Sequence, residues 1–414
     1  MRVAVLSLIE SAGDEPDVLR GYLPIGGRSI LRHQIGLALS LGCKRIVVMA
    51  EAISGELVAM QHAAERGGAQ FHVIATARML APLLLPDDDV FVLGDGLLVM
   101  PDAAREMLDA GPVVLTLPVE TALPLGFERI DINYAFAAAM RFPGRVAAGL
   151  AELPPEWNVQ SALLRLAAQA RIAHRGVPAS LLNDGRWNIV RTEAEAHRVE
   201  RQWLNLHTTK SSAGSATPGE RLTTLIVRRL GPAMLHAGTR PALAGVAAGA
   251  VGLLGGGLGW LGHFAIGFLL LGLGWMVERV ASLLGQIERN SLLVSGSARR
   301  GVAIFHLLID AGFVTLATWR CELPPGHGWP WGAAAFAPVL LIGMMRLVPL
   351  ALANRPWSRW LEDRLLTGCV LAIVSIFLPF DAAVALAVLG LLGTCLFALQ
   401  FEGSSPNPRL TSEA

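Results

Sequence analysis

Charged residues, lysine and tyrosine are all scarce in this chain. Lysine occurs only at Lys44 and Lys210, there are 2 tyrosines in 414 residues, and charged residues make up 16% of the total. Soluble proteins carry about 25% charged residues. Because 53% of the residues are hydrophobic and the mean hydropathy is +0.50, the composition excludes a single soluble domain. The apolar excess lies in the second half of the sequence.

Cysteine is also rare, and a strong net charge is absent. The four cysteines, Cys43, Cys321, Cys369 and Cys395, are scattered without a Cys-x-x-Cys spacing, which argues against a zinc site and a disulfide framework. The net charge of +1 gives no basis for binding nucleic acid. Residues 1–10 lack the basic stretch and long apolar core of a secretory signal, so they are expected to begin a cytosolic domain with a strand.

The first half alternates short β-branched segments with amphipathic helical ones. Strands are predicted at 2–9, 45–49, 70–74, 90–93 and 113–117, and helices at 31–41, 51–66 and 101–110. This alternation is typical of an α/β, Rossmann-like domain with a mostly parallel sheet covered on both faces. Ligands bind such sheets beyond the carboxyl ends of the strands, where Gly94-Asp95-Gly96 is expected to lie.

The second half is predicted to be an all-α bundle of six membrane-spanning helices. The spans are expected at 241–261, 263–283, 301–319, 332–353, 365–380 and 382–400, and the first two are rich in glycine, which favours close packing. Arginines concentrate in alternate loops, at Arg289, Arg299 and Arg300 and again at Arg355, Arg359 and Arg364. By the positive-inside rule, these loops, the amino-terminal domain and the tail are expected in the cytosol of a multi-pass inner-membrane protein.

Shorter segments complete the predicted organisation. Residues 206–220, rich in Ser, Thr, Gly and Ala, are expected to be a flexible linker after an α/β domain of residues 1–205. Residues 221–239 combine apolar residues at helical spacing with arginines, which fits either an interfacial helix facing anionic head groups or a solvated helix packed on the soluble domain. The membrane domain then covers 240–401, and a disordered tail is expected at 402–414.

Two segments of the first half resemble the sugar-phosphate and inositol-phosphate nucleotidyltransferases. Residues 23–35, LPIGGRSILRHQI, followed by 42–48, GCKRIVV, are similar to that family's glycine turn, helix and strand, and residues 92–95, VLGD, are similar to its strand-end Gly-Asp. The family's carboxylate at this place holds a divalent metal, and Mg²⁺ prefers hard oxygen ligands. The resemblance therefore implies substrate binding at Gly26, Gly27 and Arg28, and Mg²⁺ at Asp95. The alternative for Asp95 is a helix cap or turn residue.

The first loop departs from that family's pattern. The family wraps a triphosphate with the backbone amides of a Gly-x-Gly-Thr-Arg loop. Residues 10–17 of this chain are ESAGDEPD, with one glycine and several carboxylates that would repel phosphate. A weaker similarity at Trp187-Asn188-Ile189-Val190 places Asn188 where the family has a second metal-binding Asp.

The order of domains resembles the CDP-alcohol phosphotransferases. As a fusion, the chain is similar to the bifunctional inositol-phosphate cytidylyltransferase and di-inositol-phosphate phosphate synthase proteins. That membrane family carries Asp-x-x-Asp-Gly-x-x-Ala-Arg and a later Gly-x-x-x-Asp-x-x-x-Asp, whose four carboxylates hold two metals. Here Gly285 to Arg289 takes the Gly-x-x-Ala-Arg place, which implies substrate binding by Arg289. The four acidic positions hold Ala281, Leu284, Phe305 and Ile309.

Ionisable residues remain inside the predicted spans. Charged groups at membrane depth are costly and mark functional cavities or internal pairs. The hypothesis is that Asp310 and Arg346 pair across a cavity with His306 beside them, and the alternative is a purely structural ion pair. Glu278 and Arg279 are close to the end of a predicted span and are expected to extend towards the interface.

Two principal hypotheses on function follow. The first is an enzyme, a transferase of phosphorus-containing groups that makes or uses a CDP-activated alcohol in phospholipid, polar-lipid or phosphodiester synthesis; its catalytic residues are unassigned. The second is a pseudoenzyme, which binds a nucleotide or lipid head group or partners an active enzyme. Transport through the polar cavity is a third alternative. Expected partners are membrane lipids, a nucleotide or CDP-alcohol, and a second copy of the chain in a homodimer.

Overall fold

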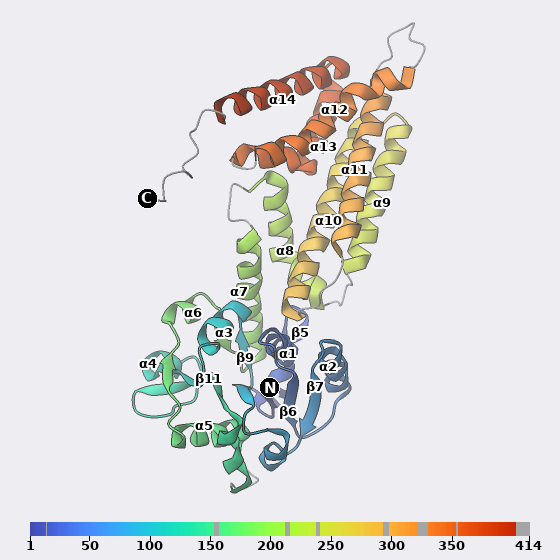
Figure 1. The fold of residues 1–414 in the computed structure, drawn as a ribbon. Helices are drawn as coiled ribbons and strands as arrows, with labels where there is room; N and C mark the ends of the chain where they lie inside the picture. Colours follow the sequence, from blue (N-terminus) through green and yellow to red (C-terminus); the bar gives the residue numbers. More distant parts are fainter. Residues whose placement is uncertain are drawn as a thin grey trace, which may run out of the picture. The chain divides into compact units, whose positions relative to one another are not determined.

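The chain divides into two compact units (Figure 1). The computed structural model describes residues 1–13, 15–152, 157–211, 216–236, 241–292, 298–321, 330–352 and 355–402. The first unit is built mainly from Met1–His207, and the second mainly from Thr208–Gly231, Thr239–Gly285 and Ser297–Ala414. The first unit is α/β and the second is helical, so the predicted fold class is confirmed.

A seven-stranded sheet forms the centre of the first unit. The strand order is β12-β10-β11-β8-β1-β6-β7. In that order the strands are His174–Gly176, Val113–Pro118, Tyr134–Pro143, Asp89–Leu93, Arg2–Leu8, Arg45–Ala50 and Gln70–Ile74. β8, β1, β6 and β7 pair in parallel, and so do β10 and β12, which confirms the mostly parallel sheet.

The sequence did not predict β11. This strand runs antiparallel to both of its neighbours, β8 and β10. Its sequence, YAFAAAMRFP, is rich in alanine, which has a strong preference for helix, and has no β-branched residue. Seven of its ten residues are buried. Burial between two paired strands therefore overrides the local preference.

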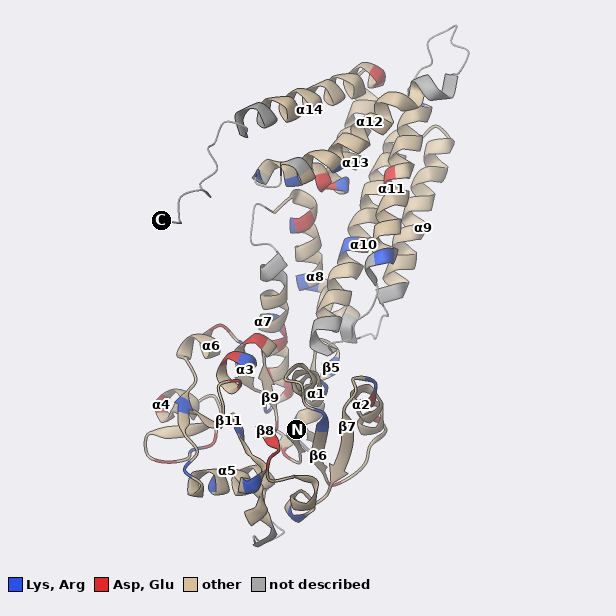
Figure 2. Ribbon diagram, viewed as in Figure 1, with Lys and Arg blue, Asp and Glu red and all other residues tan. Residues whose placement is uncertain are grey.

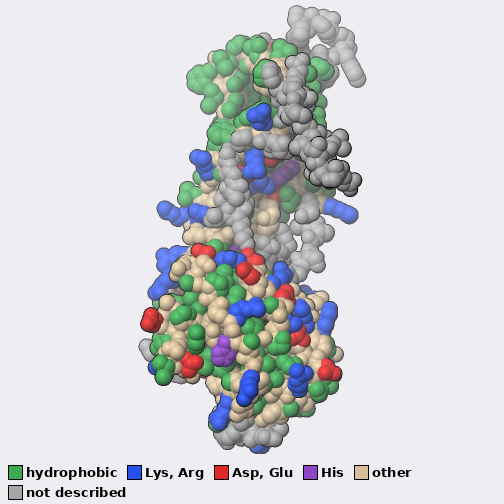
Figure 3. All heavy atoms as spheres, turned by 60° about the vertical axis from the view of Figure 1, so that its left-hand side comes forward, with side chains coloured by type: hydrophobic (Ala, Val, Ile, Leu, Met, Phe, Trp, Pro, Cys, Tyr) green, Lys and Arg blue, Asp and Glu red, His purple; other side chains and the backbone are tan. Residues whose placement is uncertain are grey.

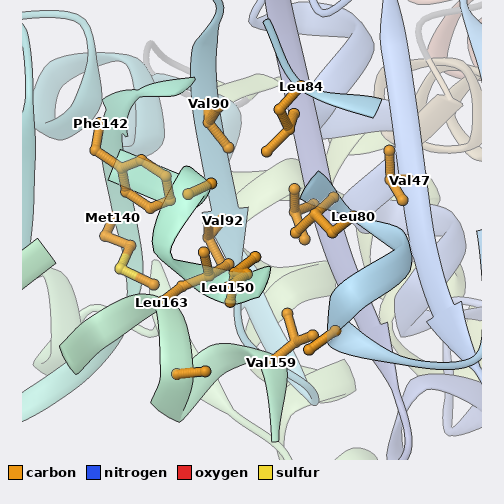
Figure 4. Close-up of a cluster of buried hydrophobic side chains, with 14 of the residues drawn as sticks. Val47, Leu80, Leu84, Val90, Val92, Met140, Phe142, Leu150, Val159 and Leu163 are labelled. Atoms are coloured by element: carbon orange, nitrogen blue, oxygen red, sulfur yellow. The ribbon is translucent and has the colours of Figure 1, made fainter. Parts of the chain in front are cut away.

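Helices and short hairpins surround the sheet. The helices of this unit are α1 (Ile30–Ser40), α2 (Gly55–Arg66), α3 (Pro101–Leu108), α4 (Val119–Ala122), α5 (Val159–Gln169), α6 (Ala179–Asn183) and α7 (Glu193–Ser211). The two-stranded pairs are β2 (Ser11–Ala12) with β3 (Glu15–Leu19), β4 (Pro24–Ile25) with β5 (Arg28–Ser29), and β9 (Leu97–Val99) with β13 (Trp187–Ile189). Figure 4 shows the core, where Val90 and Val92 of β8 and Met140 and Phe142 of β11 gather with Leu163 of α5.

Helices occupy all six regions where spans were predicted. The second unit contains α8 (Pro218–His236), α9 (Pro241–Trp260), α10 (Phe264–Leu292), α11 (Ala298–Arg320), α12 (Pro330–Ala351), the short η5 (Pro356–Glu362), α13 (Arg364–Phe377) and α14 (Phe380–Glu402). Four described stretches are long and apolar enough to cross a membrane: Leu243–Trp260, Phe264–Ile287, Arg300–Arg320 and Phe380–Phe397. The apolar stretches Ala334–Leu350 and Arg364–Phe377 are shorter. Six spans therefore remain a prediction.

Glycines allow several of these helices to approach closely. A Cβ atom built on Gly274 of α10 would lie 3.0 Å from the carbonyl oxygen of Ala248 in α9. A Cβ on Gly368 of α13 would lie 2.5 Å from the carbonyl oxygen of Phe268 in α10. Backbones this near to each other leave no room for side chains. The close packing predicted for the first two apolar segments is confirmed where α9 and α10 cross.

The predicted linker at 206–220 is helical at both ends, which corrects the expectation of a continuous flexible tether. α7 continues to Ser211 and α8 begins at Pro218. Thr217 Oγ1 accepts a hydrogen bond from the Glu220 N–H, and Glu220 Oε2 accepts one from the Thr217 N–H, both at 3.2 Å. This reciprocal capping box starts α8 within a segment whose composition suggested a linker. Residues 212–215, 237–240 and 403–414, including most of the expected tail, lie outside the described residues.

Candidate functional site

Asp95 lies at the carboxyl edge of the sheet, where the sequence placed it, but it binds its own chain. It follows β8, and its Oδ2 accepts hydrogen bonds from the backbone N–H groups of Ile9 and Glu10, both at 2.8 Å. These amides follow β1 and begin the loop that the nucleotidyltransferase resemblance assigns to phosphate. The carboxylate of Asp95 therefore occupies an anion position at these amides.

The surroundings of Asp95 favour its neutral form. Asp95 is 4% exposed, and burial raises its pKa to about 6, although the hydrogen bonds from Ile9 and Glu10 act in the opposite direction. Its Oδ1 is buried and has no hydrogen-bond partner among the described residues. Burial raises the pKa of Glu128 as well, and the negative charge of Glu10 raises it further. Arg20 lies 3.6 Å from Glu10 and partly offsets this negative charge.

These residues do not fit a Mg²⁺ site. A Mg²⁺ ion needs several converging oxygens, whereas Oδ2 of Asp95 already accepts hydrogen bonds from the Ile9 and Glu10 amides. Glu10 accepts a hydrogen bond of 3.2 Å from Asn158. Asn188 donates its own hydrogen bond of 2.7 Å to the carbonyl of Gly185. Within the described part of the chain, no group of three His, Cys, Asp or Glu side chains could hold a metal ion.

The glycine turn of the predicted substrate site is covered by α7. Gly26 and Gly27 connect β4 and β5 with φ values of +61° and +70°, a conformation that glycine adopts without strain. The Gly26 N–H donates to Glu200 Oε1 at 2.8 Å. A Cβ on Gly26 would lie 2.7 Å from the Trp203 ring. A backbone amide of the expected substrate site is thus bonded to a carboxylate, and Arg28 follows the turn in β5.

The second unit contains a polar cavity of about 370 Å³. It lies among α8, α10, α11, α12, η5 and α13, and we name it the arginine cavity because Arg279, Arg346, Arg359 and Arg364 line it. Figure 2 shows that charged residues are otherwise sparse on these helices. In Figure 3, blue side chains and a purple histidine lie just below the green surface of the upper helices. Charge in the helical unit is therefore concentrated around one cavity.

A buried carboxylate organises two of the cavity arginines. Asp310 of α11 is 5% exposed. Its Oδ2 accepts from Arg346 Nε at 2.5 Å, and its Oδ1 accepts from Arg364 Nε at 2.6 Å. Arg364 also donates to the carbonyl oxygen of Leu361 at 2.6 Å. The structure brings together the Asp310 and Arg346 pair that the sequence suggested. Arg364, the buried partner, was assigned from the sequence only to a basic loop.

The remaining arginines of the cavity are less constrained. The guanidinium of Arg279 lies over the Trp275 ring, 5.4 Å from its centroid. Arg359 is exposed on η5 and makes no side-chain hydrogen bond within the described residues. Two acidic residues at the cavity cap helices instead, since Asp363 accepts from the N–H groups of Gly219 and Leu366 at 2.6 and 3.0 Å, and Glu220 belongs to the capping box. Asp310 and Glu362 line the cavity as well, so a ligand there meets four carboxylates beside the four arginines.

Glu278 does not extend towards the membrane surface, contrary to the expectation from sequence. α10 runs to Leu292, beyond the span end predicted at 283, so Glu278 lies well inside the helix. Its side chain is buried, and its Oε2 lies 2.8 Å from His306 Nε2. His306 lines the arginine cavity, one helical turn before Asp310. The predicted cluster of His306, Asp310 and Arg346 therefore gains Glu278, Arg279 and Arg364.

The positions of the CDP-alcohol phosphotransferase acids are apolar in structure as well as in sequence. Ala281, Leu284 and Ile309 are 6%, 5% and 4% exposed. Phe305 packs beside the hydrophobic cluster of the unit. None of these side chains can ligate a metal, so no metal-dependent step can use these positions. Arg289 lies in α10, and its side chain is outside the described part of the structure.

No family model and no curated protein matches this chain. Among solved structures, it is similar to "Structure of the inositol-1-phosphate CTP transferase from T. maritima", with 12% sequence identity and a TM-score of 0.36. That similarity covers 49% of this chain and 96% of the other. Sequence identity this low carries no argument about chemistry. The fold is defined by the chain's own sheet and helices: a Rossmann-like α/β unit followed by helices able to cross a membrane.

Proposed function

We propose that this chain is a membrane-bound binding protein for phosphorylated head groups, which occupy the arginine cavity without being transferred. The observation that carries the proposal is the fixing of Arg346 and Arg364 by one buried carboxylate, Asp310. Guanidinium groups bind phosphate through planar, paired N–H donors. Because Asp310 holds both side chains in place, less side-chain entropy is lost when a phosphate binds.

The contacts of Arg346 leave it able to bind a ligand. Its side chain is 42% exposed, and only Nε bonds Asp310. The terminal nitrogens of its guanidinium have no hydrogen-bond partner among the described residues. Arg359 and Arg279 add two more cationic groups to the same cavity. Four carboxylates share the lining, of which Asp310 pairs with two arginines while Asp363 and Glu220 cap helices. The volume of about 370 Å³ suits one phosphorylated head group.

Binding is a better match to these residues than transfer. Transfer from a CDP-alcohol in the resembling family uses four metal-binding carboxylates, and apolar residues stand at those positions here. In the first unit, Asp95 and Glu200 occupy backbone amides that would otherwise face phosphate. A lipid head group, a CDP-alcohol and a soluble phosphate ester all carry an anionic phosphate esterified to an alcohol. This is the group that the arginine cavity would recognise.

The test is a titration of the full chain purified in detergent. The probes are glycerol 3-phosphate and CDP-glycerol, with phosphatidylglycerol against phosphatidylcholine in nanodiscs as the lipid arm. Arg359→Gln removes one charge-assisted hydrogen-bond donor, so we expect about tenfold weaker binding of the preferred probe. The matched control is Arg355→Gln, because Arg355 is also exposed and lies just before η5 but does not line the cavity.

The arms of the titration separate the ligand sources. Binding of phosphatidylglycerol alone would identify a lipid head group, and binding of glycerol 3-phosphate alone a soluble ester. Failure of every probe to bind, or equal losses for both arginine variants, would contradict the proposal. Release of CMP from CDP-glycerol in the presence of Mg²⁺ would instead establish the transferase hypothesis.

A further inference from the structure

Glu278 and His306 form an isolated pair at the wall of the arginine cavity. Glu278 comes from α10 and His306 from α11, and the Oε2 to Nε2 distance is 2.8 Å. Glu278 is 5% exposed, and His306 is its side-chain hydrogen-bond partner among the described residues. The His306 side chain is 27% exposed and lines the cavity. One end of the imidazole is thus fixed in the protein while part of the ring faces the cavity.

The carboxylate determines which ring nitrogen carries the proton. A buried carboxylate requires a hydrogen-bond donor, and the nearest donor is His306 Nε2. In a neutral imidazole with its proton on Nε2, Nδ1 carries a lone pair and can only accept. No other hydrogen bond to the ring occurs within the described part of the chain. The hydrogen bond therefore assigns a proton to Nε2 and leaves Nδ1 without a protein partner among the described residues. Nδ1 accepts in the neutral ring and donates in the imidazolium, and a hydroxyl group can pair with it in either form.

The pair lies close to the groups expected to hold phosphate. His306 and Asp310 are four residues apart on α11, so they share one face of that helix about one turn apart. Asp310 fixes Arg346 and Arg364. His306 and both arginines line the same cavity, so a phosphate ester bound at the arginines shares that cavity with the histidine.

We infer that Nδ1 of His306 forms a hydrogen bond with a hydroxyl group of the bound ligand, and that Glu278 is the residue that positions it. This inference rests on the proposed function of the arginine cavity and narrows its ligand to phosphate esters that carry a hydroxyl group. Discrimination arises because a ligand without the hydroxyl would leave Nδ1 covered and unpaired.

The experiment compares two esters of equal charge, glycerol 3-phosphate and propyl phosphate, by titration of the full chain in detergent. The wild-type chain is expected to bind glycerol 3-phosphate about tenfold more tightly, the gain that one hydrogen bond at a buried acceptor gives. The measured quantity is the ratio of the two dissociation constants. A variant that merely damages the fold weakens the binding of both esters equally and leaves this ratio unchanged.

Two variants test the residues. Glu278→Gln removes the charge that fixes the tautomer, so the ratio is expected to fall about threefold while propyl phosphate still binds. Replacing both partners, Glu278→Leu with His306→Phe, avoids a buried unpaired charge and should bring the ratio to about one. His263→Phe is the control, since His263 is exposed and lies elsewhere on the unit.

The outcomes separate the two proposals. Equal affinity of the wild-type chain for both esters, or a preference that survives the double replacement, overturns the role of His306 and leaves phosphate binding intact. Absence of binding of either ester to the wild-type chain overturns the arginine cavity as a phosphate site and this inference with it.

Discussion

Asp95 keeps the position of a metal ligand but makes the bonds of a structural residue. Its Oδ2 joins the ends of β8 and β1 through two backbone amides. Burial opposes the charged form of this carboxylate more strongly than the two amides and the charge of Arg20 favour it, so its pKa is raised. The Mg²⁺ binding that the resemblance implies would need surroundings that favour the ionised carboxylate.

The raised pKa of Asp95 predicts a specific dependence of stability on pH. Its folded pKa is about 6, against an ordinary value of 3.8. The stability that this proton contributes is therefore complete below about pH 4 and is lost as the pH rises through 6. Asp95→Asn cannot ionise and keeps an oxygen for both amides. The wild type should thus lose about 2 to 3 kcal/mol of its free energy of unfolding, relative to the variant, as the pH rises from 4 to 7.

Hydrogen exchange of peptides from β1 and β8, measured on the full chain during a urea titration, gives this difference. Parallel pH profiles for the variant and the wild type would show that the pKa of Asp95 is the same in the folded and the unfolded chain.

At the scale of elements, glycines determine how closely the helices of the second unit approach. Gly368 of α13 faces the backbone of α10 at Phe268, and Gly274 of α10 faces α9 at Ala248. Gly343 of α12 provides a contrast, because a Cβ there would meet nothing within 4 Å. The same substitution should therefore have opposite effects at two helical positions.

Gly368→Ala is expected to destabilise the second unit by about 1 to 3 kcal/mol, since its methyl group would overlap the Phe268 carbonyl and push two helices apart. Gly343→Ala should be neutral or stabilising by up to about 1 kcal/mol, because alanine favours helix. Thermal unfolding of both variants in the same detergent compares them directly. If the two variants melt at the same temperature, the α10 and α13 backbones are not in close contact.

The elements that the sequence predicted are those whose local pattern agrees with their packing. The β-branched strands at 2–9 and 45–49 and the helix at 31–41 are of this kind, and the structure contains them. β11 was missed because its alanines are buried by neighbours that come from distant parts of the chain. The start of α8 was missed because a capping box was hidden in a segment of linker-like composition.

The candidate site was predicted only in part, for a related reason. His306, Asp310 and Arg346 were recognisable because ionisable residues are conspicuous inside apolar spans. Arg364 and Glu278 stand near the ends of predicted spans, where the sequence suggests contact with water. Their burial depends on where helices begin and end, and periodicity does not fix helix boundaries to within a turn. The bonds of Asp95 and Glu200 to loop amides depend on contacts between residues far apart in sequence.

For the whole molecule, the distribution of arginine predicts the orientation in the membrane. With the amino-terminal unit in the cytosol and six spans, the connection near Arg355 should be cytosolic and the turn at Leu261 should lie on the opposite side. Leu261 is 67% exposed and Arg355 is also exposed, so both tolerate labelling. Single cysteines at these positions, in a chain whose native cysteines are replaced by alanine, test this arrangement.

A membrane-impermeant thiol reagent should label Leu261→Cys in intact cells and Arg355→Cys only in inverted vesicles. Labelling of both positions from one side would mean that an even number of the three intervening helices, α10, α11 and α12, cross the bilayer.

Asp363 joins the beginnings of two helices of the second unit. This carboxylate is 1% exposed and accepts from the first turns of α8 and α13 at once, through Gly219 and Leu366. The next residue, Arg364, is a wall of the arginine cavity. Two consecutive residues thus connect the start of α8 with the wall of the cavity, so a substitution at Asp363 would disturb both places at once.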